Sequence, residues 1–258
     1  MGIIIFNGTS SQEVGVVVEA PPDYQMAERD YEIVHVPGRN GDLIVDNGSF
    51  HNVDRTYQLA FGSLQYSFQE LTFRISKWLH SASGYARLED TYEPEYFRLA
   101  SYHESAMFTN IFHRAGRAPI TFDCKPQRFL KSGEVPITFA TNASVYHHSE
   151  EGGMSGYEMG TIEKSIFNPT SCEELPLINV QGTGIAEIRI GEYRMTIASV
   201  NVALTIDSEL QDVYSGSLNR NGDVEMPRGF PKLAPGANRV RVYGDSVTVE
   251  VIPRWWTL

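Results

Sequence analysis

Short runs in which apolar and polar residues alternate make up most of the chain, and this period of two is typical of half-buried β-strands. The clearest block covers residues 29–61. It predicts three strands separated by two turns, at residues 37–41 and at residues 46–48. Each turn contains an Asn-Gly pair, whose residues tolerate positive φ angles. We therefore expect a β scaffold that presents polar loops to its surroundings.

One segment has the period of a helix instead. Ser67 followed by Glu70 forms a capping-box pattern, and the apolar residues after it recur on one helical face. Those residues are Phe68, Leu71, Ile75, Trp78 and Leu79. The pattern predicts a helix of about 14 residues that covers a sheet around residues 57–61, and Gly84 offers a C-terminal stop.

The second half of the chain again favours strands. Residues 140–160 are rich in Ser, Gly and charged residues, a composition typical of a linker or an exposed loop. Short strands with Gly and Pro between them follow, which predicts a two-sheet antiparallel sandwich. We interpret residues 182–184 as a turn between two strands and residues 219–223 as a hairpin turn.

Length and composition predict two folded domains. The 258 residues are 41% hydrophobic and 21% charged, which is ordinary for a folded chain, and domains of roughly 100–200 residues are usual. We place the first domain at residues 1–138 and the second at residues 139–258. The net charge of −11 is spread over both halves, with 17 acidic and 12 basic residues in 1–139 and 15 and 9 in 140–258. No basic domain is available for tight nucleic-acid binding.

The chain contains no run of 18 apolar residues, so no membrane span is predicted. Its apolar start is interpreted as a first strand that ends at Asn7-Gly8 rather than as a signal peptide. Folding in a cytoplasm is therefore expected. Cys124 and Cys172 lack metal-binding or redox spacing, which favours free thiols. The alternative that they form one disulfide with each other is left open by the sequence.

No residue pattern indicates an active site. Histidines and carboxylates occur in small groups, but none has the spacing of a metal site, and two neighbouring carboxylates do not define a glycosidase cleft. We expect no catalytic residue, no cofactor and no metal. The groups considered are His147, His148, Glu150 and Glu151; His103, Glu104 and His113; and Glu93 with Glu95.

Several of these motifs, taken in order, resemble one protein family. The V-P-G-R-x-G-D-L turn at residues 36–43, the second Asn-Gly turn and the aromatic strand before the helix resemble the N-terminal domain of distal tail proteins (Dit). These proteins are baseplate hub subunits of long-tailed phages of Gram-positive bacteria. The second half continues the resemblance with motifs at residues 167–170, 176–178, 182–184, 206–209 and 230–238.

The resemblance implies a mainly β fold, with a β-rich N-terminal domain carrying one amphipathic helix and a galectin-like C-terminal β-sandwich. It implies a hexameric ring in the virion tail tip, assembled in the host cytoplasm. Its partners would be the tail tube protein and the tail-associated lysin or fibre hub, with the receptor-binding and tape-measure proteins as further candidates. The chain has no long insertion of the kind that forms a separate carbohydrate-binding module in some members.

The polar turn at residues 37–41 is the predicted contact between subunits, with Arg39, Asn40 and Asp42 at or near it. The excess of acidic over basic residues fits a ring whose central channel is lined by carboxylates, which would repel the phosphates of passing DNA. A carbohydrate-binding module that recognises a host cell-wall saccharide through tyrosines, Trp255 and Trp256 is the alternative. A cell-wall hydrolase is a third interpretation.

Overall fold

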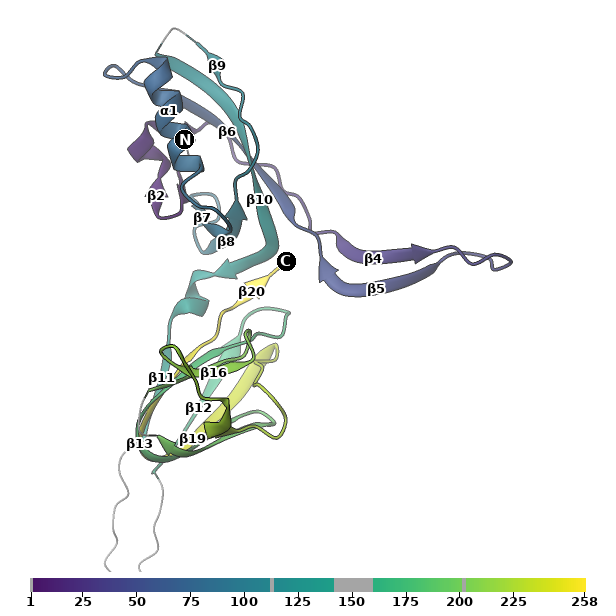
Figure 1. Ribbon diagram of the computed structural model, residues 1–258, viewed down its shortest axis with the longest axis vertical. Helices are drawn as coiled ribbons and strands as arrows, with labels where there is room; N and C mark the ends of the chain where they lie inside the picture. Colours follow the sequence, from purple (N-terminus) through teal and green to yellow (C-terminus); the bar gives the residue numbers. More distant parts are fainter. Residues whose placement is uncertain (1, 112–113, 142–159, 201–202) are drawn as a thin grey trace, which may run out of the picture. The chain divides into compact units, whose positions relative to one another are not determined.

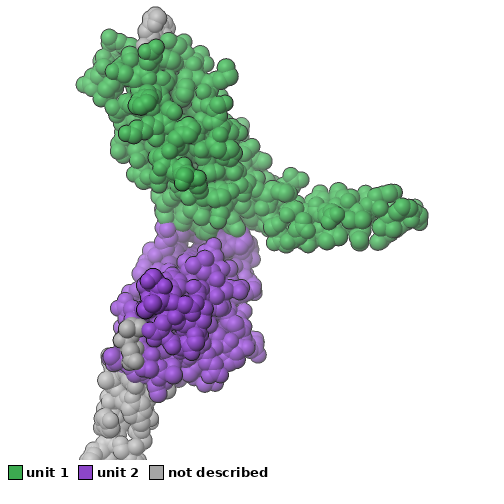
Figure 2. All heavy atoms as spheres, viewed as in Figure 1, with its two compact units in different colours: residues 1–129, 258 green, residues 130–257 purple. Residues whose placement is uncertain are grey.

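The computed structural model describes residues 2–111, 114–141, 160–200 and 203–258. The chain forms two compact units, residues 1–129 with Leu258 and residues 130–257 (Figure 2). The domains predicted from sequence divide nine residues later, at 138 and 139. The described chain is mainly β, with antiparallel pairing and one α-helix (Figure 1). This confirms the predicted fold class of a mainly β protein with a helix in its N-terminal part.

The first unit is built on one sheet, in the strand order β2-β1-β7-β8-β10-β6-β3, with β9 paired to β10 (Figure 1). Every second residue of strand β6 is buried, and the residues between them are exposed or half-buried, as in a strand with one face on a core. The first strand ends at Asn7-Gly8, as predicted, where both residues have positive φ. The strands are β1 (Ile4–Phe6), β2 (Thr9–Ser10), β3 (Val16–Val18), β6 (Val53–Gly62), β7 (Ala86–Asp90), β8 (Tyr96–Ser101), β9 (Thr109–Asn110) and β10 (Ala115–Leu130).

The predicted helix is α1 (Phe68–Leu79), and its capping box between Ser67 and Glu70 is present. Its buried residues join those of β6 in one core, as the spacing predicted. The helix ends before Gly84, so the predicted stop is wrong. The side chain of Asn7 donates a hydrogen bond of 3.2 Å to the carbonyl of Ser81, and this tertiary contact holds the chain just after the helix ends.

Strands β4 (Arg29–Val34) and β5 (Leu43–Phe50) form a separate two-stranded sheet. Their connection spans the first predicted turn, but the second predicted turn, at residues 46–48, is wrong. Those residues lie inside β5, where pairing shifts from Asp30–Ser49 to Tyr31–Asp46. The result is a β-bulge. Strand β6 pairs with β3 and β10 instead of β5, and this long-range pairing separates the hairpin from the sheet.

The second unit is an antiparallel sheet that folds over a single core. Its two longest strands, β13 and β19, are each shared by two layers of the unit. One half of the β13–β19 pair lies between β11 and β15, and the other half lies between β12 and β14. The strands of this sheet are β11 (Ile137–Ala140), β12 (Gly160–Asn168), β13 (Leu177–Ile190), β14 (Tyr193–Val200), β15 (Leu204–Asp207), β16 (Asp212–Ser215), β17 (Leu218–Asn219), β18 (Val224–Glu225) and β19 (Gly236–Ile252). Strand β20 (Trp256–Thr257) is not part of this sheet.

Two of the predicted turns in this unit are wrong. Residues 182–184 lie at a bend inside the continuous strand β13, where a Cβ on Gly182 would lie 2.2 Å from the carbonyl oxygen of Ser246. Glycine is required there because the backbones of β13 and β19 approach closely. Residues 219–223 link β17 to β18 through a 3₁₀ turn, while the hairpin turn lies between β16 and β17.

Candidate functional site, an exposed hairpin arm

The hairpin of β4 and β5, residues 29–50, is an exposed part of the first unit, and we call it the arm. None of its residues is buried. The arm extends away from the sheet of its unit (Figures 1 and 2). An isolated two-stranded hairpin is marginally stable in water, so an arm of this length is expected to gain stability from a binding partner.

Both faces of the arm carry apolar side chains. Ile33 and Ile44 are paired across the strands, so they share one face, and they are 58% and 67% exposed. Leu43 and Val45 lie on the opposite face and are 40% and 41% exposed. An apolar surface of this extent outside a core marks an interaction site. The two outer strand edges also leave backbone N–H and C=O groups available for pairing.

The tip of the arm contains all three residues that the sequence indicated for a subunit contact. Arg39, Asn40 and Asp42 are exposed in the loop between β4 and β5. The backbone N–H of Arg39 donates to the carbonyl of Val36 at 3.1 Å, and His35 Nδ1 lies 3.0 Å from Asp42 Oδ1. Asp42 therefore also orders the loop. Their contact with another subunit stays a prediction.

The root of the arm is fixed by a polar network that the sequence analysis missed. Asp46 forms an ion pair with Arg29 and accepts a hydrogen bond of 2.8 Å from the backbone N–H of Gly48. That N–H lowers the pKa of Asp46. Asp30 accepts from Ser49 at 2.9 Å. The network closes around the bulge, so it sets the direction in which the arm leaves the unit.

A buried ionic cluster lies in the sheet next to the loop that leads into the arm. Arg55, which is 4% exposed, reaches Asp90 Oδ2 at 3.1 Å and Glu93 Oε2 at 3.0 Å. Arg98 and Arg128 also contact the Glu93 carboxylate, at 3.3 and 3.0 Å. Three cations therefore surround one carboxylate, and the cluster binds four strands and one loop together.

Tyr24 connects this cluster to the loop before the arm, residues 19–28. Its ring lies 5.4 Å from the Arg55 guanidinium and 5.3 Å from that of Arg128, and its hydroxyl donates to Glu93. Burial alone would raise the pKa of Glu93, but the hydrogen bond from Tyr24 and the neighbouring arginines lower it overall. Glu93 is thus ionised and has a structural role in the cluster.

The other sequence candidates do not form a catalytic or metal site among the described residues. Glu95, His103 and Glu104 are exposed, and no group of three potential ligands is present in the described part of the chain. Cys124 and Cys172 are free thiols in different units, and burial raises the pKa of Cys124 to about 12. The remaining candidates lie outside the described residues; they are His113, His147, His148, Glu150 and Glu151.

Trp255 does not support the saccharide-binding alternative. It is 5% exposed and packs in the core of the second unit, so its ring is not available to stack on a sugar. Trp256 is half-buried, and its backbone N–H donates to Glu174 at 3.0 Å. The structure describes no helix that is long and apolar enough to cross a membrane.

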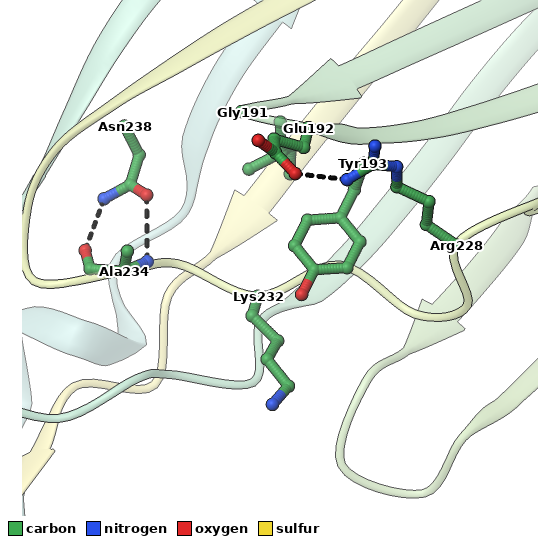
Figure 3. Close-up of a pocket in the computed structure, with 8 residues that line it drawn as sticks. Gly191, Glu192, Tyr193, Arg228, Lys232, Ala234 and Asn238 are labelled. Atoms are coloured by element: carbon green, nitrogen blue, oxygen red, sulfur yellow. Dashed lines mark hydrogen bonds and ion pairs between the residues drawn. The ribbon is translucent and has the colours of Figure 1, made fainter.

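A cleft of about 570 Å³ opens in the second unit next to Tyr193 (Figure 3). Its charged side chains are already paired, Arg228 with Glu192 and Lys232 with Glu173 at 2.9 Å. The amide of Asn238, a further lining residue, bonds to the backbone of Ala234. No nucleophile with an adjacent base is among the described residues that line the cleft.

Comparison with solved structures finds a strong match over the full length of the chain. No family model matches the sequence, and no curated protein matches it. The crystal structure of the Dit protein (gp 19.1) of SPP1, described as a paradigm of the hub adsorption apparatus in phages that infect Gram-positive bacteria, covers 100% of both chains. Its TM-score is 0.68 at 11% sequence identity. The chain therefore has the fold of a phage distal tail protein, which confirms the resemblance detected in the sequence.

Proposed function

We propose that this chain is a structural hub subunit of a phage tail tip, part of the apparatus that adsorbs to the host. The exposed arm is the observation that carries the proposal. In this chain, which has the Dit fold, the arm has apolar side chains on both faces and unpaired backbone groups along both outer edges. These features suit a subunit that joins other chains. The absence of a recognised chemical pattern in the sequence agrees with a structural role.

The proposed assembly is a hexameric ring formed by the first unit. A closed ring needs a heterologous interface, in which one surface of a subunit meets a different surface of the next. The arm supplies one such surface. Arg39, Asn40 and Asp42 lie at its tip, and Arg39 has no ion-pair partner among the described residues, so its guanidinium is available for a neighbouring subunit.

In this proposal the ring joins the tail tube protein to the tail-associated lysin or fibre hub, within the virion tail tip. Receptor-binding and tape-measure proteins are further partners, and the second unit is a galectin-like sandwich. The net charge of −11 supports a lumen that repels DNA phosphates rather than holding them. Assembly takes place in the host cytoplasm.

The test is the variant Arg39→Glu, imaged by negative-stain electron microscopy next to the wild type. Charge reversal at the tip should reduce the fraction of rings at equal protein concentration. Arg228→Glu is the matched control, because Arg228 is an exposed arginine of the second unit with 63% of its side chain accessible. If Arg39→Glu forms rings as readily as this control, the tip does not lie in the subunit contact.

A further inference from the structure

The first unit has a second exposed apolar surface, on the outer side of helix α1. Phe73 is 71% exposed and Leu64 is 90% exposed. Phe73 and the half-buried Tyr66 border a groove of about 370 Å³ that Gln69, Glu70 and Arg74 also line. We call this surface the helix patch. Solvent-facing positions of a helix that packs on a sheet are normally polar, so an exposed phenylalanine here calls for a partner.

The helix patch is well ordered in the isolated chain. The Arg74 guanidinium lies 4.6 Å from the centre of the Tyr66 ring, and it donates to the backbone carbonyl of Glu13 at 3.1 Å. Near Leu64, the Arg114 guanidinium donates to the backbone carbonyl of Leu64 at 3.0 Å. The wall of the groove formed by Tyr66 and Arg74 is therefore held in place before any partner binds, which lowers the entropic cost of binding.

The charges of the arm and of the helix patch are complementary. The arm, residues 29–50, holds four carboxylates against two arginines. The helix patch and its surroundings hold Glu13 and Glu70 against Arg74, Lys77 and Arg114. A locally positive surface stands out on a chain with a net charge of −11. Opposite potentials favour the encounter of two surfaces and fix their orientation.

We propose that the helix patch of one subunit receives the arm of the next subunit, with Ile33 and Ile44 packed against Phe73. This inference rests on the proposed ring. The arm and the patch of a single chain are both exposed, so they do not cover each other. Their opposite charges favour a second copy as the partner. An arm that docks on a different surface of its neighbour is a heterologous contact, which a ring requires.

A complementation experiment tests this pairing. Ile44→Asp removes the arm surface and leaves the patch, while Phe73→Asp removes the patch and leaves the arm. Leu210→Asp is the control, because Leu210 is 68% exposed in the second unit. Each full-length variant is studied by sedimentation velocity over a range of concentrations, and circular dichroism checks that it is folded. Leu64→Asp replaces Phe73→Asp if the latter does not fold.

Each single variant should associate at least about tenfold more weakly than the wild type and the control. A mixture of the two should form a one-to-one heterodimer, because one intact arm meets one intact patch. The pairing is wrong if the mixture stays monomeric. It is also wrong if Phe73→Asp assembles normally while Ile44→Asp does not, and in that case the arm docks elsewhere and the proposed ring stands. A wild type that is monomeric throughout contradicts both proposals.

Discussion

Glu174 gives a sharp test of the physical reasoning, since it is a buried carboxyl without a cation. Its side chain is 0% exposed. Oε1 accepts hydrogen bonds from the Thr170 hydroxyl at 2.7 Å and from the Trp256 backbone N–H at 3.0 Å, whereas Oε2 has no partner in the described structure. Burial raises the pKa of Glu174 from 4.5 to about 7, against these two hydrogen bonds. The folded protein therefore favours the protonated carboxyl.

The sign of the pH effect follows from this shift. In the unfolded chain Glu174 ionises near its ordinary pKa of 4.5, while in the folded chain it keeps its proton up to about pH 7. The free energy of unfolding therefore falls as pH rises between these values. Each unit of pKa difference is worth about 1.4 kcal/mol, so the full loss is about 3 kcal/mol above pH 7. Glu174→Gln replaces the carboxyl with a neutral group and removes this dependence.

The assay is urea unfolding of the second unit at about pH 4 and about pH 8, with Trp255 and Trp256 as fluorescent probes in a Trp78→Phe background. From about pH 4 to about pH 8, the free energy of unfolding of Glu174→Gln should increase by about 3 kcal/mol relative to that of the parent. The control is Glu173→Gln, because Glu173 is exposed and pairs with Lys232 at the surface. Parallel pH profiles for the parent and Glu174→Gln would refute the assigned ionisation behaviour.

Three further substitutions have defined outcomes. Asp90→Asn leaves Arg55 with a single carboxylate and should cost about 3 kcal/mol in thermal or urea unfolding; an unchanged stability would mean that the ion pair adds nothing. Ser67→Ala removes the N-cap of α1 and should cost about 1 kcal/mol, and a loss below about 0.3 kcal/mol would contradict the capping box. Gly182→Ala forces a Cβ against the Ser246 carbonyl and should cost at least about 2 kcal/mol, whereas a neutral result would show that the bend can relax.

The helix and the first strands were predictable because their signals are local. The Ser67–Glu70 capping box and the spacing of Leu71 and Ile75 act within a few residues, and the structure reproduces them. The bend of β13 was not predictable in this way. Gly182 and Gly184 would suit a turn equally well. Only the pairing of β13 with β19, which is distant in sequence, makes this segment a bend in a continuous strand.

The candidate site also combines features that local sequence patterns predicted with features that depend on long-range contacts. The exposed tip of the arm was recognised from its turn residues, but its separation from the sheet depends on the pairing of β6 with β3 and β10. The ionic cluster around Arg55 gathers residues from several strands and a loop, so no local pattern revealed it. Phe73 did carry a usable signal, because it is a large apolar residue on the polar side of the helix.

The central claim is that this chain assembles into a ring through its arm. Light scattering coupled to size exclusion measures the mass of the wild-type assembly most directly, with a shortened arm, in which residues 31–45 are replaced by Gly-Asn-Gly, run under the same conditions. The proposal predicts six times the mass of one chain for the wild type and a loss of that species for the shortened arm. A single-chain mass for the wild type at every concentration, or an unchanged sixfold mass after shortening, would contradict it.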